Sequence, residues 1–294
     1  DNPEFFSIDG ETPMIPGSSL HGMLRNLLEI ITFGKVHFVS ASNPIFFRAV
    51  AADRTDPLKS PYEKIIGKFS RNVRAGYLMQ KNGNWYIQPA EKIGKSYFAK
   101  VKDWNKKQGY SPVEGVKGLI RLDDTENYKV QYHDVAYDAN GDFVSRVYTP
   151  DEGQYADGVL VCSGNMAETQ GDNKTAKSPR KNYTLVARPN ENANILSISK
   201  QAINDYVRGL TAFQKEDPFD SNYGVLKAGR PVFYIDEGNH VLQFAHTPNF
   251  RVAVRILENG EFHAVTPLDH VPWQLRKERT ITDYAEAMFG YVDG

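Results

Sequence analysis

Three polar residues in one short stretch, Ser18, His21 and Arg25, have the types and spacing needed to hold a phosphodiester. They are spaced i, i+3 and i+7, so on a helix they share one face, opposite an apolar stripe. Gly17 permits a tight turn, and a helix that starts beside Ser18 and Ser19 presents free backbone N–H groups, which attract phosphate. The stretch therefore predicts a phosphate-binding cradle.

The same stretch also fits an ordinary capped core helix. Apolar residues recur at the spacing of one buried helical stripe: Leu20, Met23, Leu24, Leu27, Leu28 and Ile31. In this alternative Ser18 or Ser19 caps the helix, Gly34 ends it, and His21 faces solvent. The residue pattern alone leaves both interpretations open.

Three segments resemble known sequence elements of one family. The segment from Ile15 to Asn26 (IPGSSLHGMLRN) closely resembles the signature of the RAMP superfamily, the RNA-binding backbone subunits of CRISPR effector complexes, and is most similar to those of type III. Asp283 to Gly290 (DYAEAMFG) resembles a second element of these proteins. A looser resemblance to a branch with long insertions lies in Val73–Leu78, Trp85–Ala90 and Pro231–Tyr234.

The resemblance implies a function and a set of partners. It implies a ferredoxin-like or RRM-like core, and a subunit that binds CRISPR guide RNA and target RNA, stacks beside other RAMP subunits, and kinks the guide–target duplex with a projecting hairpin. RAMP proteins usually carry Lys or Arg where His21 stands, which weakens the expected phosphate contact at neutral pH. The rival from another class is a scaffold whose hairpins bind only proteins.

A catalytic role for Asp1 is implied by the resemblance alone. Type III backbone subunits that cut target RNA carry an Asp at a similar distance before the signature that begins at Ile15. There Asp1 would bind a divalent metal such as Mg²⁺ or orient the attacking 2′-hydroxyl. The alternative is a loop residue that helps Pro3 to set a turn. Asp9 is the next candidate, but Asp9-Gly10 is more typical of a turn.

The composition of the chain excludes some classes of protein. The chain has 294 residues, a formal net charge of −1 and a single cysteine, Cys162. A disulfide framework and a zinc site with two or more cysteines are therefore excluded, and a reducing, cytoplasmic setting is expected. No apolar run approaches the length of a membrane span.

Charge is distributed unevenly along the chain. Residues 54–121 hold about fifteen Lys or Arg against five Asp or Glu, whereas residues 122–158 hold about nine acids against two bases. The basic block interleaves cations such as Arg71, Arg74 and Lys92 with aromatics such as Tyr77 and Tyr97, which is typical of single-stranded RNA binding. We expect Arg71 and Arg74 to bind RNA; the alternatives are solvated surface charge and an ordinary twisted sheet.

Turn signals indicate an antiparallel α+β fold with few helices. Hairpins are expected around Asn82-Gly83, Asn140-Gly141, Gly238-Asn239 and Asn259-Gly260, and helices after Ser19, over about 199–214 and after Thr282. Residues 1–50 and 183–294 are expected to form the RAMP core, and 51–182 an inserted region, basic and then acidic, rich in hairpins, with a mobile loop at 164–182. Because a ferredoxin-like core needs a strand before its first helix, the chain is expected to be a fragment.

Overall fold

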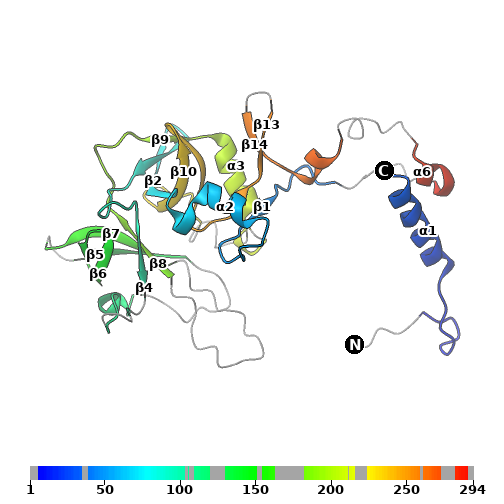
Figure 1. Cartoon of the computed structure of the whole chain (residues 1–294), viewed down its shortest axis with the longest axis horizontal. Helices are drawn as coiled ribbons and strands as arrows, with labels where there is room; N and C mark the ends of the chain where they lie inside the picture. Colours follow the sequence, from blue (N-terminus) through cyan, green and yellow to red (C-terminus); the bar gives the residue numbers. More distant parts are fainter. Residues whose placement is uncertain are drawn as a thin grey trace. The chain divides into compact units, whose positions relative to one another are not determined.

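The chain divides into two compact units, residues 1–43 with 265–294, and residues 44–264 (Figure 1). The computed structural model describes residues 6–34, 39–102, 105, 109–119, 130–150, 154–162, 182–210, 212–215, 224–258, 261–272 and 282–290.

The first unit is built around helix α1 (Gly17–Ile31). Its N-cap residue is Pro16, whose carbonyl accepts the N–H of Ser19 at 2.9 Å, and no side chain caps the helix. The prediction of a Ser18 or Ser19 cap was therefore wrong, because the N-cap is Pro16, two residues before Ser18, and both serines fall in the first turn of the helix. Both remain exposed.

Helix α1 ends in a Schellman motif. The Gly34 N–H donates to the Glu29 carbonyl at 2.7 Å, and the Phe33 N–H donates to the Ile30 carbonyl at 3.4 Å. The left-handed residue is Phe33, with φ 52°, not the expected Gly34. Since Thr32 is the C-cap residue, Gly34 occupies the position after the left-handed one.

The apolar stripe of α1 is exposed, contrary to the expectation of a buried face. No residue of α1 is buried, and Leu24 keeps 52% of its surface. The expected short helix near the end is confirmed as α6 (Tyr284–Phe289), which starts with a capping box between Asp283 and Glu286 and packs against α1 (Figure 1). A 3₁₀ turn, η4 (Pro267–His270), completes the described elements of this unit.

The second unit contains a closed five-stranded barrel in the order β10-β11-β9-β3-β2. Its strands are β2 (Arg74–Lys81), β3 (Asn84–Pro89), β9 (Leu196–Ile198), β10 (Pro231–Glu237) and β11 (His240–Ala245). The predicted β2–β3 and β10–β11 hairpins are confirmed, and Asn82 and Gly83 have φ 51° and 76° as a type I′ turn requires. The β9–β11 pair is parallel.

A five-stranded antiparallel sheet, in the order β4-β8-β7-β5-β6, forms the other half of this unit. Its strands are β4 (Ala99–Lys102), β5 (Gln131–Asn140), β6 (Phe143–Tyr148), β7 (Ala156–Cys162) and β8 (Asn182–Ala187). One face buries a cluster that includes Leu160 and Leu185, and the other packs Val161 and Val186 against barrel residues such as Phe233. The barrel and the sheet therefore share a core.

Short elements complete the second unit. They are β1 (Phe46–Phe47) paired with β12 (Val252–Ala253), the hairpin β13 (Arg255–Glu258) with β14 (Glu261–Ala264), α2 (Lys59–Ile66), η1 (Lys68–Ser70), η2 (Glu114–Val116), α3 (Lys200–Gly209) and α4 (Ala212–Lys215). The single helix expected over 199–214 is two helices, because Leu210 has extended backbone angles. Ser199 caps α3 by accepting the Ala202 N–H.

The fold is mixed α+β with few helices and many strands, as predicted. The RRM-like core, the missing first strand and the division into core and insertion stay predictions. Strands β2 and β3, from the range expected to be inserted, close one barrel with β9, β10 and β11. The loop expected at 164–182 lies outside the described residues except for Asn182, which begins β8. None of the described helices combines the length and apolarity needed to cross a membrane.

Candidate nucleic-acid interface

The two segments that carry the family resemblance contact each other in the first unit. The Arg25 Nη1 donates to the Gly290 carbonyl at 2.7 Å, and its Nε pairs with Glu29 at 2.9 Å. The His21 ring meets the Phe289 ring edge to face, with centroids 4.8 Å apart. Helix α6 therefore holds both side chains in place, so neither is simply solvent-facing.

A row of small residues runs along α1 beside Arg25. Ser18, Gly22 and Arg25 follow one another at i, i+4 and i+7, and outside the helix itself no described atom lies within 4 Å of where a Cβ would stand on Gly17 or Gly22. Glycine inside a helix costs about 1 kcal/mol relative to alanine. Since packing within the chain does not require glycine at position 22, the absent side chain suits close approach by another molecule's backbone.

The catalytic candidate of the sequence, Asp1, lies outside the described residues, so its role stays a prediction. Asp9 is confirmed as a turn residue: its carboxylate accepts hydrogen bonds from Ser7, Glu11 and Thr12. These hydrogen bonds, the Thr12 backbone bond first, hold the pKa of Asp9 well below its usual range. Within the part of the chain that the structure describes, no group of three His, Cys, Asp or Glu residues is arranged to hold a metal ion.

A second candidate surface lies in the second unit, where cations meet an aromatic ring. The Arg74 guanidinium and the Lys92 ammonium lie 5.1 and 4.8 Å from the centroid of the Tyr97 ring. Arg74 also pairs with Asp236 at 3.0 Å, and the Asp236 side chain is only 5% exposed. Burial raises the pKa of Asp236, and the charge of Arg74 opposes that rise. The ion pair fixes Arg74 while leaving its side chain 42% exposed.

The same surface continues along strand β4. The Lys100 Nζ lies 3.4 Å from both the Phe69 carbonyl and the Ser70 hydroxyl, and partial burial of its ammonium group lowers its pKa. Lys68 lies over the Phe69 ring, 5.7 Å from its centroid. We call this surface the cationic face; its members are Lys68, Phe69, Arg74, Lys92, Tyr97 and Lys100. Arg71, the other predicted RNA-binding arginine, is exposed just after η1.

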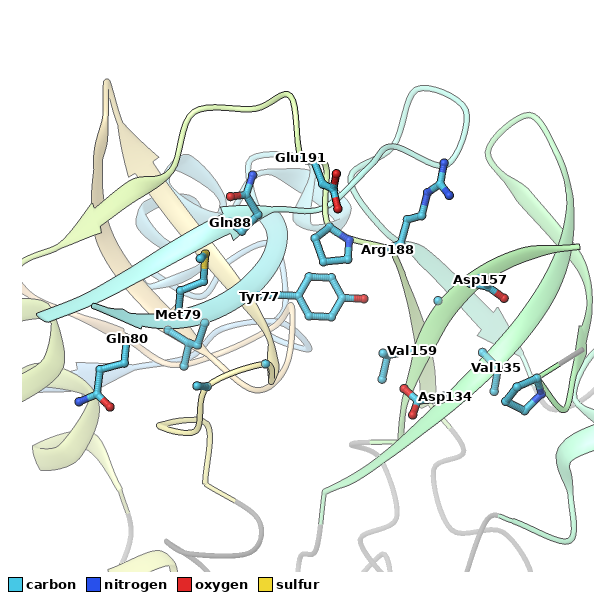
Figure 2. Close-up of a pocket in the computed structure, with 16 residues that line it drawn as sticks. Tyr77, Met79, Gln80, Gln88, Asp134, Val135, Asp157, Val159, Arg188 and Glu191 are labelled. Carbon is cyan, nitrogen blue, oxygen red and sulfur yellow. The ribbon is translucent and has the colours of Figure 1, made fainter. Parts of the chain in front are cut away.

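A cavity of about 990 Å³ opens farther along strand β2, at residues 77–80, between the barrel and the sheet (Figure 2). Figure 2 shows the Tyr77 ring between strand β2 and the sheet strands that carry Asp134 and Asp157. The Tyr77 hydroxyl donates to the Ala187 carbonyl at 2.8 Å, and burial, with Asp134 adding to it, raises the pKa of Tyr77. The buried phenol therefore stays neutral.

The cavity lining is acidic overall. Its charged lining residues are Asp134, Asp157, Glu191 and one cation, Arg188, which pairs with Glu91 at 3.0 Å. Because the carboxylates outnumber the single, already paired guanidinium, phosphate is disfavoured there. We call this site the acidic cavity.

Sequence reasoning located only part of these sites. Tyr77 was grouped with the cations, yet its ring lines the acidic cavity, where strand β2 faces the sheet (Figure 2). Phe69 and Asp236 were not singled out. The flanking Lys68 and Arg71 could have identified Phe69, whereas Asp236 meets Arg74 only because β10 pairs with β2.

Comparison with known proteins gives one family match. The model of the RAMP superfamily matches residues 1–224, which is most of the chain and includes helix α1 and the cationic face. Among curated proteins, none matches this sequence.

Proposed function

The chain belongs to the RAMP superfamily of CRISPR-associated RNA-binding proteins, and from this premise we propose that it is a guide-RNA-binding backbone subunit of a type III effector complex. In this role it binds the sugar–phosphate backbone of CRISPR RNA, lies beside other RAMP subunits, and receives the target RNA on the guide. Phosphate contacts fix register and orientation without reading bases, as a subunit that must accept many guides requires.

The row of small residues on α1 carries the proposal. Ser18 and Ser19 offer exposed hydroxyls at the helix start, where Gly17 and Gly22 leave the helix backbone uncovered. Arg25 lies at the end of the row and keeps donors for a phosphate, since its hydrogen bonds to the described residues use only Nε and Nη1. A strand of RNA backbone fits such a row, because hydroxyls, helix-terminal N–H groups and a guanidinium are the donors that phosphates take.

The test is the salt dependence of affinity for a labelled single-stranded RNA of mixed sequence. Arg25→Ala should weaken binding by roughly tenfold and lower the slope of log affinity against log salt by about one unit, because one phosphate contact is lost. Gly22→Leu should weaken binding by a similar factor while thermal stability stays equal or rises, because leucine favours the helix and its Cβ would meet no atom of the described residues.

Arg208→Ala is the matched control, since Arg208 is an exposed helix arginine on α3 in the other unit. It should leave affinity and slope nearly unchanged. Unchanged binding in both α1 variants would remove α1 from the RNA site. Binding by the unsubstituted protein that shows no salt dependence would instead favour the scaffold alternative.

A further inference from the structure

Phe69 combines two features that rarely occur together. Its side chain is 85% exposed, and its backbone has φ 60°, ψ 26°, in the left-handed region. Bulky residues seldom adopt this conformation, which normally falls to Gly or Asn. The turn between α2 and β2 therefore presents a large apolar ring to solvent at a position where glycine would be more stable.

The next residue, Ser70, also has a positive φ, 65°, but its contacts explain it. The buried Ser70 hydroxyl donates to Asn249, and its main-chain N–H donates to the Gly67 carbonyl at 3.0 Å. These bonds fix the turn, and the Asn72 N–H adds a bond to the Ile66 carbonyl at 3.1 Å. The turn is thus held by its own main-chain and Ser70 hydrogen bonds, and the Phe69 ring belongs to none of the hydrophobic clusters formed by the described residues.

Two lysines contact Phe69, one at its main chain and one over its ring. Lys68 lies over it and Lys100 donates to its carbonyl, and among the described residues no carboxylate pairs with either lysine. The other ring of the cationic face, Tyr97, has Arg74 and Lys92 at 5.1 and 4.8 Å from its centroid. Exposed rings beside cations have the chemistry with which proteins bind single-stranded RNA, where bases stack on the rings and the cations neutralise phosphates.

We propose that Phe69 is a stacking platform for an unpaired base of bound RNA, with Lys68 and Lys100 on the flanking phosphates. This inference rests on the proposed RNA-binding function. It adds a second RNA contact, which lies in the other unit, and it specifies the ligand as single-stranded rather than duplex RNA. A base inside a duplex already stacks on a neighbouring base on each side, so neither of its faces is open to an aromatic side chain. The rigid turn pre-organises the ring, so little ordering entropy is lost on binding.

Substitutions at Phe69 separate stacking from simple apolar contact. Phe69→Leu keeps an apolar side chain but removes the π face, and it should weaken binding of a labelled single-stranded RNA by about fivefold to a hundredfold. Phe69→Trp should retain or improve binding, and duplex RNA should bind wild type and Phe69→Leu alike. The salt slope should not change, because no charge is lost. Phe143→Leu, at the exposed tip of the β5–β6 hairpin, is the control.

Phe69→Gly gives a readout that misfolding cannot imitate. Glycine adopts the left-handed conformation without strain, so the melting temperature should stay equal or rise by a few degrees. Affinity for single-stranded RNA should fall as in Phe69→Leu. Opposite movements of stability and binding are the signature of a strained residue kept for a ligand.

Three results overturn the inference in distinguishable ways. If the wild-type chain binds single-stranded RNA and Phe69→Leu binds it equally well, the platform is wrong while the proposed function stands. If the wild-type chain binds neither form of RNA, the proposed function fails and the platform fails with it. A shared loss of single-stranded and duplex binding in Phe69→Leu would also reject stacking.

Discussion

The cationic face and the acidic cavity lie at different positions along one strand, β2, yet carry opposite charge. Arg74 begins the strand and belongs to the cationic face, while Tyr77, three residues on, lines the acidic cavity. The cations come from sequence neighbours in residues 68–100, whereas the carboxylates of the cavity come from β5, β7 and the segment after β8. Folding therefore places carboxylates from distant parts of the chain beside Tyr77, which is only three positions after Arg74 on the same strand.

The difference explains how a chain with a net charge of −1 can bind a polyanion. Net charge sums both surfaces, but the attraction felt by RNA depends on the local field within about a Debye length, roughly 8–10 Å. We expect RNA on the cationic face, and we expect the acidic cavity to orient it by repulsion.

Charge reversal on the cationic face should have the largest effect. Arg71→Glu combined with Lys92→Glu should weaken single-stranded RNA binding by about a hundredfold or more, because each lost charge-assisted contact is worth roughly 1.5–3 kcal/mol. Arg71 and Lys92 are chosen because no described carboxylate pairs with them, so thermal stability should change little. Electrophoretic mobility shift with guide-length RNA measures the first effect and thermal melting the second.

Intact RNA binding in this double variant, together with the loss of a protein neighbour from the assembly, would favour the scaffold alternative. Arg74 is left out because reversing it would place a carboxylate beside the buried Asp236. Loss of binding in an Arg74 variant would then be ambiguous between a lost phosphate contact and a damaged fold.

Removing the cation of the Arg74–Asp236 ion pair should lower stability and change how stability depends on pH. Arg74→Ala should lower the free energy of unfolding by about 1–2 kcal/mol near pH 7, because it leaves the Asp236 carboxylate buried without its partner; the partial exposure of Arg74 keeps the loss at the low end. Burial raises the pKa of Asp236 above its unfolded value, so the buried charge costs stability at neutral pH.

The deficit of Arg74→Ala should therefore shrink as the pH falls from about 7 toward the raised pKa of Asp236, where the carboxyl takes up a proton. Urea unfolding of wild type and Arg74→Ala across this range measures it. Asp236→Asn, which has no charge to bury, should remove the pH dependence of the Arg74→Ala effect. A deficit that grows on acidification would contradict this assignment.

Charge reversal in the acidic cavity should have the smallest effect. Asp157→Lys should leave RNA affinity unchanged or raise it by less than about fivefold. A repulsive charge becomes attractive, but the residues that line the cavity do not form a phosphate-binding site. Asp157 is exposed on β7, so stability should hardly change. A loss of RNA binding in this variant would mean that the cavity, not the cationic face, contacts RNA, and filter binding at two salt concentrations distinguishes these cases.

Local signals predicted the hairpins well. Asn82-Gly83 specifies a type I′ turn, and the strands on either side pair in register from Lys81 and Asn84 to Gly76 and Pro89. The α6 helix followed in the same way from Asp283 and Glu286, which form its capping box. Such features depend on residues within a few positions of one another, so one sequence is enough to find them.

Long-range pairing could not be predicted in the same way. The barrel closes because β9 pairs with both β3 and β11, and nothing in the three residues Leu196–Ile198 specifies either partner. The exposed stripe of α1 shows the converse limit: periodicity at Leu24 and its neighbours predicts an apolar face but not what covers it. For the site, the sequence located Arg25 and Arg74, but their partners Gly290 and Asp236 come from distant segments.

Photocrosslinking tests the central claim most directly. The full chain would be bound to a single-stranded RNA that carries photoreactive 4-thiouridine at every uridine, and crosslinked peptides would be mapped by mass spectrometry. The account predicts crosslinks in residues 17–26 of α1 and in residues 68–74 and 92–100 of the cationic face. Crosslinks confined to the β5 and β7 residues of the acidic cavity would contradict the account, and so would the absence of crosslinks from both α1 and the cationic face.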